Sequence, residues 1–224
     1  MGKLVLVPVP IGNLSDITLR AIDVLKEAEV IYCEDTRTTG ILLKHHGIES
    51  GKLKSFHIHN EHHKTDQFSN EIAVGNLSAL VSDAGSPAIS DPGFMLVRAC
   101  IQKGIEVEAL PGPTALIPAI SVSGLPCDRF HFEGFLPQKK GRQKRLKELS
   151  EIEITLVFYE SPHRIVKFLG ELLEHFGPNR QMSISREISK LYEEHIRGTI
   201  AEVHSELDKR ESVKGEIVVV IAGA

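Results

Sequence analysis

Several kinds of sequence feature are scarce or absent in this chain of 224 residues. Its three cysteines form no CxxC pair, which argues against a disulfide framework and is typical of a protein in a reducing compartment. No stretch approaches the roughly 20 apolar residues that a membrane-spanning helix needs. The apolar start at 4–11 contains two prolines and leads into a polar turn, so it resembles a first strand rather than a signal peptide. We therefore expect a soluble, cytoplasmic protein with no membrane segment.

The sequence also lacks the common motifs for nucleotides, metals and activated nucleophiles. It has no GxGxxG dinucleotide fingerprint, no GxxxxGK[ST] phosphate loop, no HExxH metal motif and no GxSxG nucleophile elbow. NAD, ATP and a hydrolase mechanism are therefore poor candidates.

Basic residues are not in excess, because the formal net charge is −4. A protein that holds nucleic acid by bulk electrostatics is normally basic. The charge is nevertheless uneven, since the segment 138–147 carries six Lys or Arg residues and no acid. A local basic patch beside an acidic pocket is an open alternative.

Four apolar, strand-like runs each end in a turn rich in Gly, Pro and small polar residues that leads to a helix. They are 5–13, 31–37, 80–91 and 107–114. In an open α/β sheet the loops that leave the carboxyl ends of the strands line the ligand crevice. Turns of this composition let backbone groups approach a ligand closely. The pattern predicts an enzyme built around one small-molecule cofactor.

The first half alternates strands with amphipathic helices, which predicts an α/β fold with parallel strands and right-handed crossovers. Strands are expected at 3–9, 28–33, 52–57, 78–82 and 105–110, with helices at 18–27, 37–46, 64–74, 93–103 and 114–122. In the second half, strands are expected at 130–135, 154–159, 181–186, 194–198 and 215–222, with helices at 141–150, 162–176 and 199–209. Consecutive strands near 181–198 predict a mixed sheet. We divide the chain into two α/β domains, 1–115 and 116–224, with a ligand cleft between them.

Small polar residues before several helices predict caps. Ser15 or Asp16 is expected to cap the first helix, and Asp91 and Ser161, each followed by Pro, have the N-cap signature. Thr114 is expected at the start of a helix whose free N–H groups face the cleft.

The second strand ends in the sequence CEDTR, at 33–37. In one interpretation Arg37 binds an anionic substrate group while Glu34 or Asp35 accepts a proton. In the other, Asp35 or Thr36 caps the next helix and Glu34 pairs with Arg37. Both interpretations stay open from the residues alone.

Asp83 follows another strand and has no evident helix to cap. A loop of small residues that bears one acid suits an adenosyl group, which needs hydrogen-bond acceptors but no phosphate cradle. A third charged group comprises Arg186, Glu187, Lys190, Glu193 and Glu194. Its spacing fits a binding site and a solvated ion-pair surface equally well.

The histidine-rich segment HIHNEHH, at 57–63, invites a metal-site interpretation. His57 and His59 are expected to share a strand face, but no cysteine accompanies them and neither His62 nor His63 completes a metal motif. A solvated loop is the better interpretation, in which Asn60 and Glu61 matter more than the histidines. We expect no metal.

Nine stretches together closely resemble the ribosomal RNA small subunit methyltransferase I family, within the tetrapyrrole (uroporphyrinogen/precorrin) methylase superfamily. They are VPVPIGNLSDITLRA, YCEDTRTTGILLKHHGI, HNE, VSDAGSPAISDPGFMLV, LPGPTALIPAISVSGLP, FEGFLPQKKGRQKRL, TLVFYESPHRI, REISKLYEE and KGEIVVVIAG. They span nearly the whole chain in family order. The first loop is PVPIGN rather than Gly-rich, which favours the RNA-modifying branch over a porphyrinoid substrate. Many members continue beyond the last strand, whereas this chain stops at Ala224.

The resemblance implies a tetrapyrrole methylase-like fold, S-adenosylmethionine (SAM) in the interdomain cleft, and a homodimer. It also implies methylation of the ribose 2′-hydroxyl of a cytidine in the decoding region of 16S rRNA, in the small ribosomal subunit. The cofactor residues that it implies are Pro10, Asp83, Gly85, Ser86, Thr114, Ala115, Tyr159, Arg186, Gly215 and Glu216.

A ribose hydroxyl is a weak acid and gains from a positioned base. Glu34 and Asp35 rank first for that role, with Asp83 and Glu160 behind them. We hypothesise that RNA phosphates contact Arg37, Arg164, Lys139 and Lys140. The alternatives are a methylase of the same fold that acts on a tetrapyrrole or a diphthine-type substrate, and a non-catalytic RNA-binding relative.

Overall fold

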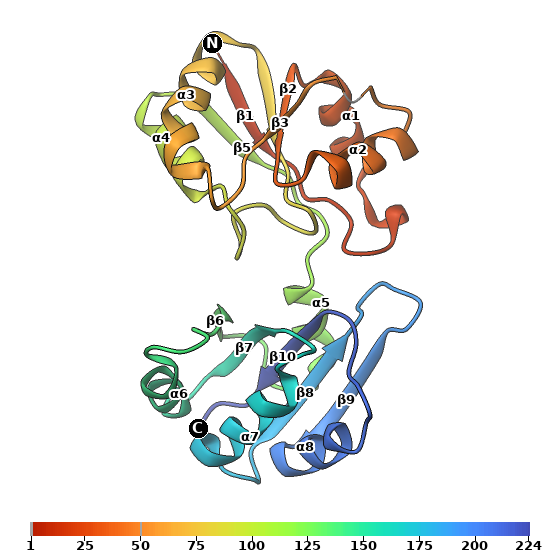
Figure 1. The fold of residues 1–224 in the computed structure, drawn as a ribbon, viewed down its shortest axis with the longest axis vertical. Coiled ribbons are helices and arrows are strands. Elements are labelled where there is room, and N and C mark those ends of the chain that lie inside the picture. The colour runs from red at the N-terminus through yellow and green to blue at the C-terminus, as the bar shows by residue number, and fades with distance from the viewer. Residues whose placement is uncertain (1, 50) are drawn as a thin grey trace. The chain divides into compact units, whose positions relative to one another are not determined.

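The computed structural model of the protein describes residues 2–49 and 51–224. The chain forms two compact units, Met1–Thr114 and Ala115–Ala224, each with its own sheet and helices (Figure 1). The division that the sequence suggested, after residue 115, lies one residue further along the chain.

The first unit is built on five parallel strands in the order β3–β2–β4–β1–β5. The strands are β1 (Lys3–Leu6), β2 (Val30–Cys33), β3 (Leu53–Ser55), β4 (Leu77–Leu80) and β5 (Glu106–Ala109). The helices are α1 (Leu19–Glu27), α2 (Thr36–His45), α3 (Glu61–Val74) and α4 (Phe94–Gln102). The predicted parallel sheet with crossover helices is confirmed.

Helices cover both faces of this sheet, α1 and α2 on one and α3 and α4 on the other (Figure 1). Side chains on a strand point alternately to opposite faces. Val5 therefore belongs to the core shared with α1 and α2, whereas its neighbour Leu4 belongs to the core shared with α3 and α4. Because helices cover both faces, the three inner strands β1, β2 and β4 are mostly apolar, whereas the edge strands β3 and β5 also carry Lys or Glu.

The start of α1 differs from the prediction. The Thr18 hydroxyl, not Ser15 or Asp16, accepts a hydrogen bond from the Ala21 N–H at 3.1 Å. Residues Leu14–Asp16 form a separate 3₁₀ turn, which the Asn13 side chain caps. The prediction was wrong because two short helical turns follow each other, and the cap belongs to the second.

The second unit has five strands in the order β6–β7–β10–β8–β9. The strands are β6 (Phe130–Phe135), β7 (Thr155–Glu160), β8 (Gln181–Arg186), β9 (Glu194–Thr199) and β10 (Ile217–Ile221). Only β6 and β7 pair in parallel, and the other three neighbouring pairs are antiparallel. The predicted mixed sheet is confirmed.

The helices of the second unit are α5 (Leu116–Ser123), α6 (Arg142–Ser150), α7 (Ile165–Phe176) and α8 (Ile200–Asp208). The last three share one apolar core with the sheet, in which Phe158 and Phe168 are almost completely buried. Helix α5 packs on β8, β9 and β10. In the described part of the chain, no helix is long and apolar enough to cross a membrane.

Helix α7 begins later than predicted, at Ile165 rather than at Pro162. The Ser161 hydroxyl accepts a hydrogen bond from the His163 N–H at 3.3 Å, so it stabilises a turn before the helix and is not its N-cap. A Ser-Pro pair is compatible with either role, because in both the serine hydroxyl accepts a hydrogen bond from an N–H a short distance further along the chain. The prediction of an N-cap at Ser161 was therefore wrong.

Candidate active site

The loops that leave the carboxyl ends of the first sheet are held against one another by backbone contacts. Val9 and Gly85 exchange two hydrogen bonds of 2.9 Å, which join the loops after β1 and β4. The Ser86 hydroxyl donates to the Pro113 carbonyl at 3.2 Å and joins the loop after β5 to the same group. A Cβ on Gly112 would lie 2.7 Å from the Cβ of Pro8, so only glycine allows this approach.

The loop after β4 has an unusual backbone. Ala88 and Ser90 have φ values of 68° and 63°, in the left-handed region that residues with a side chain seldom adopt. Such conformations cost on the order of 1 kcal/mol or more each and cluster at functional sites. The strain supports a functional role for this loop.

Three carboxyl side chains gather where these loops meet. The Asp83 N–H donates to Glu34 Oε1 at 3.4 Å, and the Asp35 N–H donates to Asp83 Oδ1 at 3.1 Å, so the loops after β2 and β4 hold each other. Asp91 lies close enough to raise the pKa of Glu34. The cluster therefore comprises Glu34, Asp83 and Asp91.

Two members of the cluster titrate near neutral pH. Burial, followed by the negative charges of Asp91 and Asp83, raises the pKa of the Glu34 carboxyl to about 7. Burial and then the charge of Asp83 raise the pKa of Asp91 to about 6. A carboxyl group with a pKa near the working pH is suited to act as a general base.

Asp35 has a different role in the structure. Its carboxylate accepts a hydrogen bond from the Arg37 N–H at 2.8 Å and thereby caps α2, as one of the two interpretations predicted. It also binds the Arg37 guanidinium at 2.6 Å, and these bonds lower the pKa of Asp35 to about 2. The predicted pair between Glu34 and Arg37 does not form, because Asp35 takes the guanidinium and Glu34 turns toward Asp83.

Asp91 was assigned to capping from the sequence, and that assignment was wrong. Helix α4 begins at Phe94, and its N-cap is Gly93, with φ of 141° and no side-chain cap. A Cβ on Gly93 would lie 3.0 Å from Leu80, so the chain passes close to β4 here. This path carries Asp91 back toward Glu34 and Asp83. The Asp-Pro pair gave no signal that could distinguish this placement from a cap.

The residues that the resemblance implied for the cofactor divide between the units. Pro10, Asp83, Gly85, Ser86 and Thr114 belong to the loops of the first unit described above. Pro10 and Gly85 are buried, whereas Asp83 is exposed. Thr114 lies two residues before α5, whose N-cap position is Ala115, so the predicted helix start at Thr114 was slightly early.

The other implied residues lie in the second unit. Tyr159 packs its ring against Phe132 and Phe135, with centroids 5.1 and 5.6 Å away. Gly215 has φ of 90°, and a Cβ there would collide with the side chain of Glu187, which in turn accepts a hydrogen bond from the Glu216 N–H at 3.1 Å. Gly215 and Glu216 therefore have a local structural role in addition to any contact with a ligand.

The charged group around Arg186 forms two sets of ion pairs. Glu194 binds both Arg186, at 3.0 Å, and Arg210, at 2.8 Å. Lys190 binds Glu187 at 2.9 Å and Glu216 at 3.0 Å. This arrangement agrees with the ion-pair interpretation of the segment. The guanidinium groups also lower the pKa of Glu194 to about 2.

Glu160, a lower-ranked candidate for the base, forms ion pairs in the second unit. Its side chain is 1% exposed, and it binds Arg164 at 2.8 Å and approaches Arg142 at 3.6 Å. Its carboxylate is therefore engaged in structural contacts within the second unit. The same contact anchors Arg164, one of the hypothesised phosphate contacts, to the protein.

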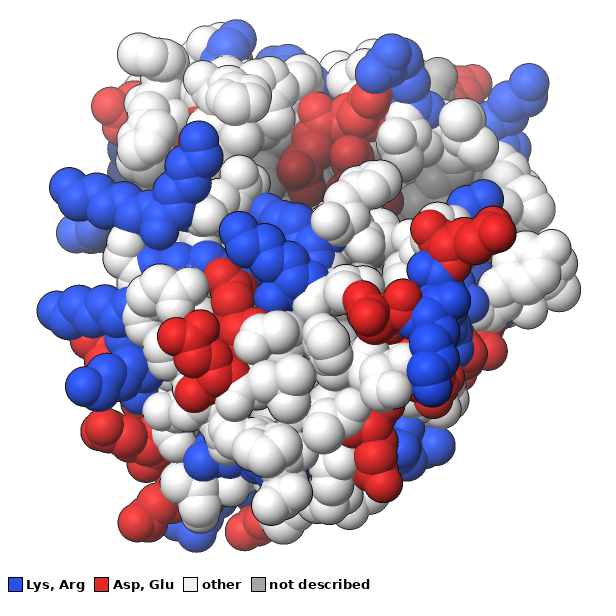
Figure 2. All heavy atoms as spheres, turned by 60° about the horizontal axis from the view of Figure 1, so that its bottom comes forward, with Lys and Arg blue, Asp and Glu red and all other residues white. Residues whose placement is uncertain are grey.

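The basic segment 138–147 separates into two kinds of side chain. Arg142 is buried and binds Glu171 at 2.6 Å, and Arg145 binds Glu133 at 2.6 Å, so both arginines hold the fold together. The four lysines are exposed, and one of them, Lys144, lies 3.8 Å from Glu148 in a loose ion pair. Blue side chains project together on the α6 side of the second unit in Figure 2. In this segment the exposed positive charge therefore comes mainly from the lysines and not from the arginines.

The histidine-rich segment forms a turn and the start of α3, so His57 and His59 do not share a strand face as predicted. Asn60 holds the turn, because its side chain accepts from the His57 N–H at 2.9 Å and donates to the Ser55 carbonyl at 3.2 Å. Among residues 2–49 and 51–224, no group of three or more His, Cys, Asp or Glu side chains is arranged to hold a metal ion.

A family model described as Tetrapyrrole (Corrin/Porphyrin) Methylases matches residues 3–204 of the chain. A protein named Ribosomal RNA small subunit methyltransferase I, from Hydrogenobaculum, is 49% identical over 220 residues, which are 98% of this chain and 95% of that protein. A protein of the same name from Thermotoga maritima is 45% identical, over 100% of this chain and 99% of that one.

Solved structures share the fold at lower identity. Uroporphyrin-III C-methyl transferase from Thermus thermophilus, complexed with S-adenyl homocysteine, is 23% identical, with a TM-score of 0.65 over 99% of this chain and 97% of that one. A diphthine synthase is 14% identical, with a TM-score of 0.73 over 98% and 90% of the two chains. The chain belongs to the tetrapyrrole methylase family and, within it, to the ribosomal RNA small subunit methyltransferase I family.

Proposed function

We propose that this chain transfers the methyl group of SAM to the ribose 2′-hydroxyl of a cytidine in 16S rRNA of the small ribosomal subunit. Membership of the methyltransferase I family supports the reaction and the RNA substrate. The observation that carries the chemistry is Glu34, a carboxyl group with a pKa near 7 among the loops at the carboxyl ends of the first sheet. The fold brings ligands to that edge of the sheet.

The reaction is an in-line displacement at the methyl carbon. The ribose 2′-oxygen forms a bond to that carbon while the carbon–sulfur bond breaks, and the sulfonium becomes a neutral thioether. The hydroxyl proton passes to the Glu34 carboxylate. A positioned base contributes about 10²–10⁴-fold to the rate. Of the two carboxylates ranked first from the sequence, Glu34 is the better acceptor because Asp35 is held by Arg37.

The loops of the first unit suit an adenosyl group. Asp83 offers an exposed carboxylate as an acceptor for hydroxyl or amino groups. Gly85 has φ of 76°, in the left-handed region that favours glycine, and its N–H and C=O both pair with Val9, so it fixes the shape of the loop that carries Asp83. SAM supplies the methyl group, and Pro10, Ser86 and Thr114 complete the proposed contacts in this unit. From the second unit we propose Ala115, Tyr159, Arg186, Gly215 and Glu216.

The exposed lysines before and on α6 are proposed to contact RNA phosphates. Lys139 and Lys140 precede the helix in a segment without acids, and Arg37 in the first unit is 88% exposed. Charges of this kind provide sequence-independent affinity that falls as salt rises. Specificity for the cytidine then resides elsewhere in the site.

We also propose that the protein is a cytoplasmic homodimer. The turn between β8 and β9 carries two large apolar side chains in solvent, Leu191 at 88% and Tyr192 at 69% exposure. Exposed apolar groups of this kind support a surface that a second copy covers. Sedimentation of the purified protein tests this proposal, and a monomer at micromolar concentration contradicts it.

The decisive test of the function is to map 2′-O-methyl groups in 16S rRNA by mass spectrometry, in cells with and without the gene. We expect one cytidine to lose its ribose methyl group when the gene is absent and to regain it with purified protein and SAM. Methylation of a porphyrinoid in place of small subunits supports the tetrapyrrole alternative. If calorimetry detects no SAM binding, the result supports the alternative of a non-catalytic RNA-binding relative.

A further inference from the structure

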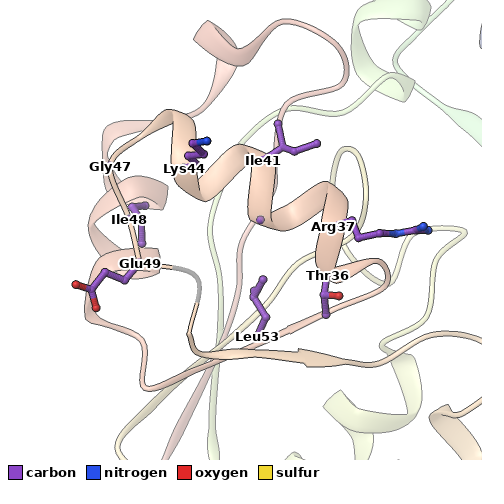
Figure 3. Close-up of a pocket in the computed structure, with 9 residues that line it drawn as sticks. Thr36, Arg37, Ile41, Lys44, Gly47, Ile48, Glu49 and Leu53 are labelled. Atoms are coloured by element: carbon purple, nitrogen blue, oxygen red, sulfur yellow. The ribbon is translucent and has the colours of Figure 1, made fainter.

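A pocket of about 930 Å³ lies on the outer side of α2. Helix α2 forms one wall, and the segment 47–49 and Leu53 of β3 form the other (Figure 3). Thr36 and Arg37, which end the CEDTR segment, also line it. The pocket therefore adjoins the loop that carries Glu34, within the first unit.

Apolar side chains line the middle of the pocket. Ile41 is 69% exposed although it lies in the middle of a helix, and Leu53 reaches from β3 toward α2 in Figure 3. Ile48 completes this surface from the opposite segment. An exposed isoleucine beside further apolar atoms favours a ligand with an apolar face.

Gly40 lies in the interior of α2 and also lines the pocket. Glycine in a helix interior costs about 1 kcal/mol relative to alanine. Packing does not require it, because a Cβ at this position would meet only Leu53 Cδ1, at 3.9 Å. Its backbone is also helical, so the fold gives no reason for the missing side chain. The absence of a side chain keeps this wall of the pocket open.

Charged groups are placed around the apolar surface. Arg37, Ile41 and Lys44 are spaced by four and three residues and so share one face of α2. Arg37 and Glu49 lie at opposite ends of the pocket (Figure 3). The Arg37 side chain is 88% exposed, so exchanging its Asp35 partner for a phosphate costs little. Arg37 lies at the end next to the loop that carries Glu34, whereas Lys44 and Glu49 lie at the other end (Figure 3). This arrangement matches a nucleotide, whose phosphate is anionic and whose base carries hydrogen-bond donors and acceptors.

We propose that this pocket binds one unpaired nucleotide of the RNA substrate, adjacent in sequence to the methylated cytidine. The phosphate lies at Arg37, and the base packs against Ile41 and Leu53, toward Lys44 and Glu49. Proteins that bind single-stranded RNA combine cations on the backbone with side chains that pack on splayed bases. Here the aliphatic side chains of Ile41 and Leu53 provide the packing surface. The proposal rests on the proposed function, because it assigns part of the substrate to a pocket outside the reacting groups.

The test fills the pocket without disturbing the helix. Gly40→Leu replaces glycine with a good helix former whose side chain occupies the space beside Leu53. Gly170→Leu in α7 is the matched control, since Gly170 also lies in a helix interior and its Cβ would meet nothing within 4 Å. Methyl transfer to small subunits from cells without the gene is measured with tritiated SAM, together with SAM binding by calorimetry, binding of the same subunits by filtration, and sedimentation.

We expect Gly40→Leu to raise the KM for small subunits on the order of tenfold, the loss of about one nucleotide contact, with SAM affinity unchanged. Gly170→Leu is expected to match the wild type. A KM equal to that of Gly170→Leu overturns the pocket assignment and leaves the proposed function intact. Loss of a dimer in Gly40→Leu also overturns it, because a second copy then covers this face. A wild type that neither binds nor methylates small subunits removes both proposals.

Discussion

Two acids of the first unit and two acids of the second stand in opposite electrostatic settings. In the first unit, Glu34 and Asp91 are partly buried among other acids, which raises the pKa of each to about 7 and 6. In the second unit, Glu133 and Glu194 are bound by arginines, which lower their pKa values. Groups whose charge the fold leaves uncompensated are suited to proton transfer, whereas paired groups stabilise the structure. The contrast supports our proposal that proton transfer occurs in the first unit, while the paired acids stabilise the second.

The largest expected effect comes from the carboxyl group that the first unit leaves unpaired. Glu34→Gln removes the proton acceptor with little change in size. We expect the kcat/KM for methyl transfer to small subunits to fall about 10²–10⁴-fold, with SAM binding retained by calorimetry. Glu133→Gln, which breaks a pair with Arg145 in the second unit, is the control and should keep its activity. Equal activity losses in both variants contradict the contrast between the units.

A buried acid of the second unit should show the reverse. Glu160→Gln leaves Arg142 and Arg164 without the carboxylate that they share, in a site where the glutamate side chain is 1% exposed. Arg142 keeps its pair with Glu171 and Arg164 is partly exposed, so the loss is that of hydrogen bonds to a charged group, about 1.5–3 kcal/mol. We expect the free energy of unfolding in urea to fall by about that amount. Full stability together with lost methyl transfer would instead identify Glu160 as the base.

The next effect concerns the coupling between two acids of the first unit. If deprotonated Glu34 is the active form, kcat/KM rises with pH through about 7, the pKa of that group. Asp91 raises this pKa through its negative charge. Asp91→Asn removes the charge, lowers the pKa of Glu34 and moves the acid limb of the pH profile to lower pH.

The pH profile of methyl transfer, measured from pH 5 to 9 with saturating SAM, checks this prediction. Asp35→Asn serves as the comparison, because Asp35 is held by Arg37 and its pKa lies near 2. That variant loses the ion pair with Arg37 but can still cap α2 through its side-chain oxygen, and it is expected to leave the acid limb in place. If the acid limb of Asp91→Asn lies at the same pH as that of the wild type, Asp91 does not influence the group that limits the reaction.

The contrast between the units also marks what the sequence could predict. Strand and helix positions followed from apolar periodicity, since parallel strands buried on both faces and amphipathic helices each leave a local pattern. The same locality explains the success at Asp35, whose cap reaches only two residues. Glu34 stood out because two acids follow a strand end, where the fold places ligands.

Other placements depend on contacts between residues far apart in the chain. Asp91 has the sequence of a cap, yet the turn at Gly93 carries it to Glu34, which is 57 positions earlier in the chain. Likewise, nothing in the basic segment 138–147 shows that its two arginines bind acids while its lysines stay in solvent. Tertiary contacts determine where these side chains lie, and those contacts cannot be predicted from local sequence propensity.

The smallest expected effect comes from those lysines. Changing Lys139 and Lys140 to Ala removes two exposed charges without touching the ion pairs of Arg142 or Arg145. We expect the affinity for unmethylated small subunits to fall and the slope of log K against log salt to flatten by roughly 1.5, since each phosphate contact contributes about 0.7–0.9. SAM binding should be unchanged. Filter binding between 50 and 200 mM salt, a range over which such contacts weaken measurably, gives the slope.

A matched pair of substitutions shows whether position or total charge matters. Lys26 and Lys209 are also exposed, and changing both to Ala alters the net charge by the same amount. Because a bulk electrostatic effect depends on total charge, it would flatten the slope equally in both double variants. A local contact flattens it only for Lys139 and Lys140. Equal slopes would therefore show that Lys139 and Lys140 do not contact RNA. The basic segment of the second unit would then have a structural role only.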